Sequence, residues 1–316
     1  MHLLAIAPMV DWTNSHMRVF LRLLLPKAVL YTDMIALGAL LHQPEKMLTF
    51  QAEEQPVILQ VGGSDLAGLA HAAQLAEQWG YDGINLNVGC PSAKVQSGRF
   101  GACLMKEPEH VVLCIRAMKE ACNIPVSIKT RIGVDQQDSY EFFRNFIIPC
   151  IEAGIDGLTV HARKAWLTGL NPKQNRSIPP LHYDYVYALK KEFPALPISI
   201  NGNIQSVAEV QAHLAHVDGV MLGRMACDNP YALTEIHRAL YPEVPLLSRQ
   251  SVWEAYLPYI EQQFSCGVPL SILCKHLLPL AHGFAGAKIW RAQLTQAMQR
   301  KDIREIYQNG VMLRCV

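Results

Sequence analysis

The feature that most constrains the fold is a regular alternation of short apolar runs with amphipathic helical stretches. Helical patterns occur near residues 14–25, 66–79, 107–121, 139–153, 183–193, 206–215 and 230–240. Eight apolar runs have the length and composition of β-strands, and they cover residues 3–7, 29–33, 57–61, 83–88, 126–131, 157–161, 198–201 and 219–222. This alternation predicts a parallel sheet whose successive strands are connected by helices.

Eight strands in one α/β domain predict a closed (β/α)8 barrel, the TIM barrel. The alternative is an open doubly wound sheet, which normally has fewer strands and a Gly-x-Gly-x-x-Gly turn after the first. Here the first strand is followed by Pro8-Met9-Val10-Asp11 instead. We therefore expect a barrel domain over residues 1–242. A small all-helical domain should follow over residues 249–316, with helices near 250–264, 270–281, 284–298 and 301–308.

A repeated phrase marks the passage from helix to strand. It reads Gly80-Tyr81-Asp82-Gly83, Gly154-Ile155-Asp156-Gly157 and, in shorter form, Val217-Asp218-Gly219. Glycine at the first position suits the left-handed conformation that ends a helix.

Composition narrows the class of protein. Half the residues are hydrophobic and 17% are charged, and no apolar run reaches the eighteen or so residues of a membrane span. The nine cysteines form no Cys-x-x-Cys pair, so we expect a reducing cytoplasm, no disulfide framework and no metal site. The overall net charge is +1, but residues 249–316 hold eight lysines and arginines against four acidic residues. The predicted helical domain is therefore basic.

A thiol stands at the end of the fourth predicted strand, in Asn85-Leu86-Asn87-Val88-Gly89-Cys90-Pro91-Ser92. The active site of a barrel is built at the carboxyl ends of its strands, and Gly89 and Pro91 constrain the turn around Cys90. Cys90 could also be a small core residue. A cysteine thiol in solution titrates near pH 8.5, so at neutral pH it can donate a proton as well as attack.

Other strand ends are polar and partly basic. Lys129 lies in a strand that is otherwise apolar on alternate positions, where a buried ammonium needs an anionic or electron-rich partner. It could form a salt bridge at the barrel mouth or stabilise negative charge on a reduced flavin. His161 could be structural or functional, and Gln60 could bind the edge of a ring or end its strand. Cys103 is expected to be structural.

The last two strand ends predict a phosphate site, because in this fold phosphate binds to the loops after strands seven and eight. These loops contain Asn201-Gly202-Asn203 and Gly223-Arg224, in which glycine lets backbone N–H groups approach an anion. Both could instead be ordinary turns. Between Arg163 and Tyr183 lies a long loop with Lys173 and Arg176, and a loop of this length is typically functional or disordered.

These segments, taken in order, resemble the tRNA-dihydrouridine synthase family over essentially the whole chain. The segments are Ala7-Pro8-Met9, Gln60 to Gly63, Asn85 to Ser92, Lys129-Thr130-Arg131, His161-Ala162-Arg163, Asn201 to Ile204 and Gly223-Arg224. The long loop resembles that of the bacterial A subfamily, which acts on D-loop uridines 20 and 20a.

The resemblance implies an FMN-dependent enzyme that uses NADPH to reduce the C5=C6 bond of uridine in tRNA. Hydride would pass from the flavin to C6, and Cys90 would give a proton to C5 from the opposite face. The implied FMN contacts are Ala7, Pro8, Met9, Gln60, Lys129, His161, Asn201, Gly202, Asn203, Gly223 and Arg224. The implied tRNA contacts, to its D-loop or elbow, are Asn87, Lys173, Arg176, Lys288 and Arg291. We expect a cytoplasmic monomer with no metal and no membrane partner.

Two other functions use the same features. A small-molecule flavin oxidoreductase, of dihydroorotate or ene-reductase type, would explain Cys90 but would leave the basic helical domain without a role. A non-catalytic RNA-binding factor could retain a flavin as a structural relic.

Overall fold

The chain, described by a computed structural model over residues 3–309, divides into two compact units. The first unit consists of Met1–Asp11 with Val29–Gly223, and the second consists of Trp12–Ala28 with Arg224–Val316. The predicted division into a catalytic domain over residues 1–242 and a helical domain over residues 249–316 stays a prediction.

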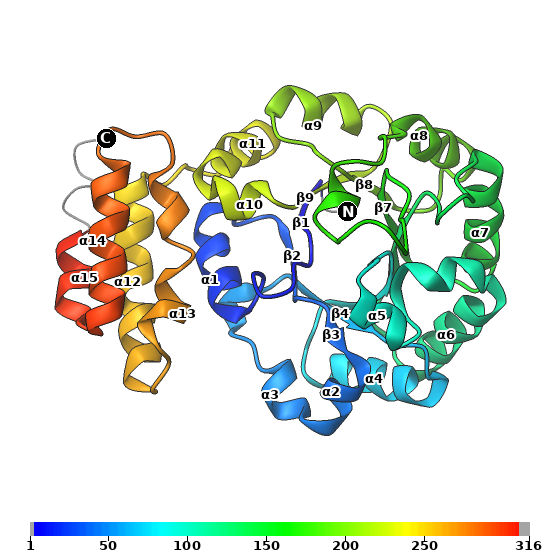
Figure 1. The fold of residues 1–316 in the computed structure, drawn as a ribbon, viewed down its shortest axis with the longest axis horizontal. Helices are drawn as coiled ribbons and strands as arrows, with labels where there is room; N and C mark the ends of the chain where they lie inside the picture. The colour runs from blue at the N-terminus through cyan, green and yellow to red at the C-terminus, as the bar shows by residue number, and fades with distance from the viewer. Residues whose placement is uncertain (1–2, 310–316) are drawn as a thin grey trace. The chain divides into compact units, whose positions relative to one another are not determined.

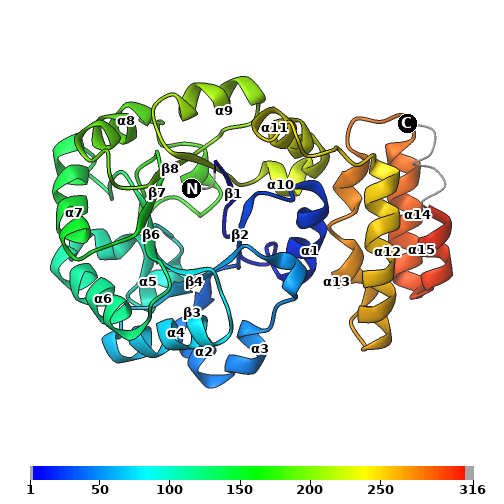
Figure 2. The ribbon, with the colours of Figure 1, turned by 180° about the vertical axis from the view of Figure 1, so that it is seen from behind.

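A closed barrel of eight parallel strands forms the first unit (Figures 1 and 2). Pairing runs in the order β1, β9, β8, β7, β6, β5, β4 and β2, and β2 pairs with β1 again. This confirms the predicted TIM barrel and rules out the open sheet, whose edges would be unpaired. The strands are β1 (Leu4–Ile6), β2 (Val29–Tyr31), β4 (Val57–Gly62), β5 (Gly83–Val88), β6 (Val126–Arg131), β7 (Gly157–His161), β8 (Ile198–Asn201) and β9 (Gly219–Leu222).

Five helices of this unit have eight residues or more, and they lie around its strands (Figure 2). Three begin at a side chain that accepts a backbone N–H of the first turn: Asp65 for α4, Ser139 for α7 and Ser206 for α9. Each helix buries apolar residues on one side. The five are α4 (Leu66–Gln78), α6 (Pro108–Ala121), α7 (Tyr140–Glu152), α8 (Tyr183–Glu192) and α9 (Val207–Leu214).

The structure contains short elements that sequence periodicity did not predict. The short strand β3 (Ile35–Ala36) pairs with the end of β4, beyond the position where β2 ends. An element of only a few residues is too short to show a periodic pattern of apolar residues, so the sequence does not indicate these elements. The others are α2 (Leu37–His42), α3 (Pro44–Leu48), η1 (Ala52–Glu54), α5 (Ala93–Ser97), η2 (Gly101–Lys106) and η3 (Gln174–Arg176).

The repeated aspartate satisfies the first N–H of a neighbouring strand. Asp82, Asp156 and Asp218 accept the backbone N–H of Val57, Val126 and Ile198, at 2.7, 2.7 and 2.8 Å. Each aspartate also donates its own backbone N–H to the carbonyl of the strand residue whose N–H it accepts, at 2.8 to 3.0 Å. Buried backbone N–H groups need partners, so the repeat aligns pairs of strands at the amino end of the barrel.

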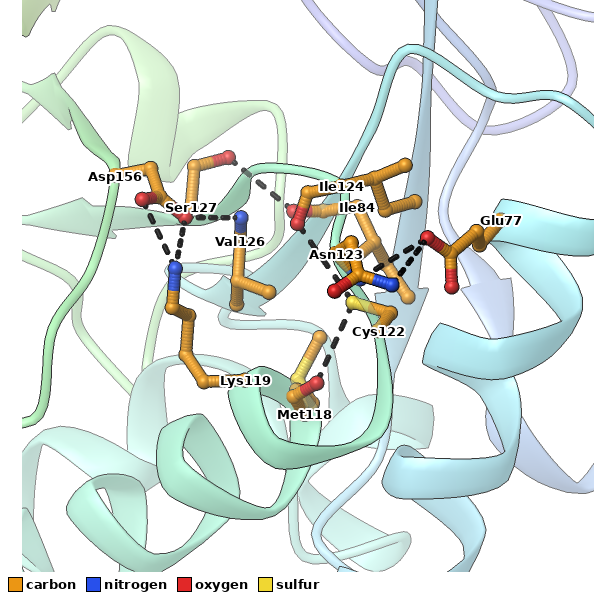
Figure 3. A network of polar contacts seen from close by, with 10 residues as sticks. All are labelled: Glu77, Ile84, Met118, Lys119, Cys122, Asn123, Ile124, Val126, Ser127 and Asp156. Carbon is orange, nitrogen blue, oxygen red and sulfur yellow. Dashed lines mark hydrogen bonds and ion pairs between the residues drawn. The ribbon is translucent and has the colours of Figure 1, made fainter.

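Figure 3 shows this arrangement at Asp156. Its carboxylate accepts the N–H of Val126 and also two contacts from the Lys119 ammonium, at 2.7 and 2.9 Å. Nearby, Glu77 of α4 accepts hydrogen bonds from the backbone and the side chain of Asn123, both at 3.1 Å. Helices α4 and α6 are thereby connected to the start of β6.

The second unit is helical. In its core the rings of Trp253 and Trp290 pack edge to face with centroids 5.6 Å apart, and the Tyr256 hydroxyl donates to the carbonyl of His16 at 2.9 Å. In residues 3–309 no helix combines the length and apolar composition needed to cross a bilayer. The elements are α1 (Ser15–Leu24), α10 (Met225–Asp228), η4 (Pro230–Ala232), α11 (Leu233–Leu240), α12 (Arg249–Ser265), α13 (Leu270–Cys274), η5 (Leu278–Ala281), α14 (Ala287–Arg300) and α15 (Ile303–Asn309).

Replacing Asp156 by alanine should lower the free energy of unfolding by about 1 to 3 kcal/mol, because the Val126 N–H and the Lys119 ammonium lose their acceptor. Urea denaturation followed by circular dichroism measures the change. The matched control is Asp184→Ala, whose carboxylate is 73% exposed and should change stability little. Equal effects of the two substitutions would contradict the structural role of the repeat.

Candidate active site

Polar side chains of neighbouring strands meet at the carboxyl end of the barrel. The register pairs Gln60 with Asn85, Asn87 with Lys129, and His161 with both Arg131 and Asn201. Gln60, Asn85 and Asn87 are buried, as are Arg131, His161 and Asn201. The structure thus brings together on one sheet the strand-end residues that the sequence predicted, from Gln60 to Asn201.

The turn that contains Cys90 is fixed by Asn87. Its side-chain oxygen Oδ1 accepts the backbone N–H groups of Gly89 and Cys90, at 3.1 and 3.0 Å. The Cys90 sulfur is 3.6 Å from the Ser92 hydroxyl, and the residue is partly exposed. The thiol is therefore held at the strand end and is not part of the core.

Gly101 lets a second segment contact this turn. Its φ is +78°, and a Cβ there would lie 2.5 Å from the Cys90 carbonyl oxygen, so no other residue fits without displacement. The next N–H, that of Ala102, donates to the same carbonyl at 2.9 Å. The glycine after Phe100 is thus explained by close approach to the Cys90 turn, a contact that sequence analysis did not predict.

Lys129 is a cation without a carboxylate partner in the described chain. Its Nζ donates to Asn201 Oδ1 at 3.3 Å, and Asn201 Nδ2 donates to the Met221 carbonyl at 2.8 Å. Burial, with Arg131 nearby, lowers the pKa of Lys129 to about 7. The alternative of a salt bridge at the barrel mouth is not observed in residues 3–309.

The loop after β8 has a conformation that requires glycine. Gly202 has φ +135°, and a Cβ there would lie 2.9 Å from the Leu181 side chain and 3.2 Å from the His161 ring. The Tyr183 hydroxyl donates to the Gly202 carbonyl, which fixes the peptide between Gly202 and Asn203. Sequence analysis did not predict this role for Tyr183.

The end of β9 lies next to that of β1. The Ala7 N–H donates to the Leu222 carbonyl at 2.7 Å, so Ala7 and Gly223 adjoin. Pro8 and Met9 are half-buried and follow Ala7, whereas Arg224 is exposed and belongs to the second compact unit.

The long loop from Arg163 to Tyr183 is ordered around the buried side chain of Asn175. This amide donates to the carbonyls of Trp166 and Leu170, at 2.9 and 3.1 Å, and accepts the Trp166 N–H at 2.8 Å. Lys173 and Arg176 are exposed on either side of it. The loop therefore presents two cations to solvent from a fixed framework.

Arg131 connects this loop with the Cys90 turn. Its Nε donates to the Gly89 carbonyl, and its Nη1 donates to the carbonyls of Lys164 and Asn175, all at 2.9 Å. This role of Arg131 has no signal in the sequence, because the three acceptors are backbone atoms.

The two basic residues predicted in the helical domain lie on α14. Lys288 and Arg291 are exposed, one turn apart, on a helix with three basic and no acidic residues. They line a shallow depression together with Ile289, Ala292, Gln293, Thr295, Gln296 and Gln299. This surface suits a polyanion.

The arrangement in the barrel suits chemistry on an electron-rich ring. Amides, a cation of lowered pKa and a thiol lie at the strand ends, and the described residues contain no cluster of three or more histidine, cysteine or acidic side chains that could hold a metal ion. The fold and site thus define a (β/α)8-barrel protein with a polar, cationic site at its carboxyl face.

Two solved structures with this fold are similar to the chain. One is 2-naphthoyl-CoA reductase, with a TM-score of 0.57 and 10% identity, covering 79% of this chain and 51% of that one. The other is morphinone reductase in complex with tetrahydroNAD, with a TM-score of 0.51 and 11% identity, covering 77% of this chain and 87% of that one.

The chain belongs to the dihydrouridine synthase family, whose family model matches residues 5–312. Relatives with the name tRNA-dihydrouridine(20/20a) synthase are similar along most of their length. That of Shewanella oneidensis is 52% identical over 293 residues, covering 92% of this chain and 88% of the relative. That of Synechocystis sp. is 50% identical over 296 residues, covering 93% and 89%.

Lys129 should make the stability of the cofactor-free protein depend on pH. Its folded pKa of about 7 lies below the unfolded value of about 10.5, so between these values the unfolded chain binds more protons. The free energy of unfolding should therefore rise from pH 7 to pH 10 in the wild type relative to Lys129→Met. Urea titrations at several pH values measure the difference, and parallel curves for the two proteins would contradict it.

Proposed function

We propose that the protein reduces the C5=C6 bond of uridines 20 and 20a in tRNA to 5,6-dihydrouridine, with FMN as cofactor and NADPH as electron donor. The observation on which this rests is the Cys90 turn, held by Asn87 at the strand ends beside Lys129. The names of the relatives support the substrate and the positions.

The residues present fit FMN. The Lys129 ammonium, without a carboxylate, would neutralise negative charge on a flavin ring, and Gln60 would hydrogen-bond a ring edge. Glycine at position 202 allows the loop to pack against Leu181 and His161. The backbone N–H groups of this loop would approach the phosphate, and Asn201, Asn203, His161, Gly223 and Arg224 would complete that end. Ala7, Pro8 and Met9 would line the adjoining side. When bound, FMN supplies the hydride that is added to C6 of the uracil.

Cys90 would complete the reduction by giving its thiol proton to C5. Its turn is fixed from two sides, by Asn87 at the N–H groups and by Ala102 at the carbonyl, so the sulfur keeps its place as substrate arrives. The cysteine is reprotonated from solvent after each turnover, because the residue is partly exposed.

Binding of tRNA would use cations on both compact units. A uridine must leave its stack to reach a site inside a barrel, so the enzyme has to hold the tRNA by its backbone. Four exposed cations would contact phosphates: Lys173 and Arg176 on the long loop, and Lys288 and Arg291 on α14. Asn87 is 8% exposed, and we include its contact with tRNA in this proposal.

Replacing Cys90 by alanine should lower the rate of dihydrouridine formation at least about a hundredfold, since a general acid accelerates a reaction by a factor of that order. Mass spectrometry of the tRNA product measures it. The variant should still bind FMN, seen as yellow colour, and tRNA. A non-catalytic RNA-binding factor would be indifferent to the substitution, and undiminished product would contradict the role of Cys90.

Replacing Lys288 and Arg291 by glutamate should weaken tRNA binding at least about tenfold and reduce its salt dependence, because two phosphate contacts are lost. Flavin reduction by NADPH should be unchanged. The matched control is Arg116→Glu with Lys191→Glu, which changes the charge equally at exposed positions on α6 and α8. A small-molecule reductase would turn over free uridine as fast as tRNA, and that result would refute the tRNA substrate.

A further inference from the structure

We propose that Asn85 is a positioning residue for Cys90, acting through Gln60 and Asn87. Asn85 is fully buried and lies two residues before Asn87 on β5, so both side chains point to the same side of the strand. This inference rests on the proposed function, in which Cys90 is the acid.

A continuous chain of side-chain hydrogen bonds connects the three amides. Asn87 Nδ2 donates to Gln60 Oε1 at 2.9 Å, and Gln60 Nε2 donates to Asn85 Oδ1 at 2.7 Å. Asn85 Nδ2 in turn donates to the Ser127 hydroxyl at 2.9 Å, and this hydroxyl lies 3.4 Å from the Ile84 carbonyl that it faces.

The chain has one direction. Asn87 must turn its oxygen toward the two N–H groups of the Cys90 turn, so its NH2 faces Gln60. Gln60 must then present its oxygen to Asn87 and its NH2 to Asn85. Asn85 completes this pattern, because it accepts from Gln60 on one side and donates to Ser127 on the other.

Burial makes this orientation costly to disturb. Gln60 is 1% exposed and Asn87 is 8% exposed, so a rotated amide finds no water to replace its lost partner. Loss of Asn85 would leave Gln60 Nε2 without an acceptor and allow Gln60 to rotate. Asn87 would then lose its acceptor and no longer hold the Cys90 turn in one orientation.

The test compares Asn85→Leu, which removes both hydrogen bonds, with Asn85→Asp. A buried aspartic acid in its neutral form accepts and donates at the same places as asparagine, so it should restore the chain. The first readout needs no turnover: iodoacetamide alkylation of Cys90, followed by mass spectrometry of its peptide, with exposed Cys266 as internal reference. The second compares reduction of the flavin by NADPH with oxidation of the pre-reduced enzyme by tRNA.

We expect Asn85→Leu to change the Cys90 alkylation rate at least about threefold relative to Cys266, and to slow the tRNA-dependent step about tenfold or more. Flavin reduction involves Gln60 but not the thiol of Cys90, so it should slow less than the tRNA-dependent step. Asn85→Asp should recover most of these losses. Wild-type alkylation in Asn85→Leu, or an Asn85→Asp variant as impaired as Asn85→Leu, would overturn the proposal.

If Asn85→Leu does not fold, Ser127→Ala replaces it, because that change removes the last acceptor of the chain, together with the hydrogen bond between the Ser127 and Tyr31 hydroxyls. It should alter Cys90 alkylation in the same direction, and no change would overturn the proposal. Failure of the proposed function is recognised separately, whatever the effect of Asn85 on alkylation: the wild-type protein would then form no dihydrouridine. Undiminished product from Cys90→Ala would refute the role of Cys90 alone.

Discussion

The closure of the barrel between β1 and β9 is the constraint on which the site depends. Because β1 pairs with both β2 and β9, all eight parallel strands end on one face. Residues from Ala7 to Gly223 are thereby brought to one place, although more than two hundred positions separate them in the sequence. The repeated aspartates support this closure from the opposite end, where Asp82, Asp156 and Asp218 each join two strands. Strand alignment and site geometry are thus set at opposite ends of the same hydrogen-bonded sheet.

Within this frame the site is held by polar contacts between buried groups. A buried amide with an unsatisfied donor or acceptor costs free energy. Each side-chain amide in the series Asn85, Gln60 and Asn87 therefore determines the orientation of the next one. Lys129 is paired with the amide oxygen of Asn201 and, among residues 3–309, with no carboxylate. An amide leaves the charge of the cation uncompensated, and an electron-rich or anionic ligand can then bind to it.

Most of the fold was predictable from the sequence, and much of the site was not. Strands such as Gly83–Val88 and Val126–Arg131 occur as predicted, because an apolar run followed by a turn fixes both ends. Candidate residues at strand ends follow directly from those strands. The roles of Arg131, Gly101 and Tyr183 were not predictable, since their partners are backbone atoms 11 to 44 positions away. The sequence shows that Asn85 lies two residues before Asn87 and so on the same side of a strand. The donor and acceptor partners of its amide could not be predicted without the register that places it beside Gln60.

Two cations of β6, the buried Arg131 and the half-buried Lys129, respond differently to pH, and this difference separates their roles. Burial lowers the pKa of Arg131 to about 10, so the guanidinium stays charged at neutral pH and continues to donate to Gly89, Lys164 and Asn175. The pKa of Lys129 is about 7, so its charge depends on what is bound beside it. The framework that joins the Cys90 turn to the long loop is therefore constant across the physiological range. Lys129, two residues before Arg131, is the cation whose protonation an anionic ligand can change, because such a ligand favours the charged form.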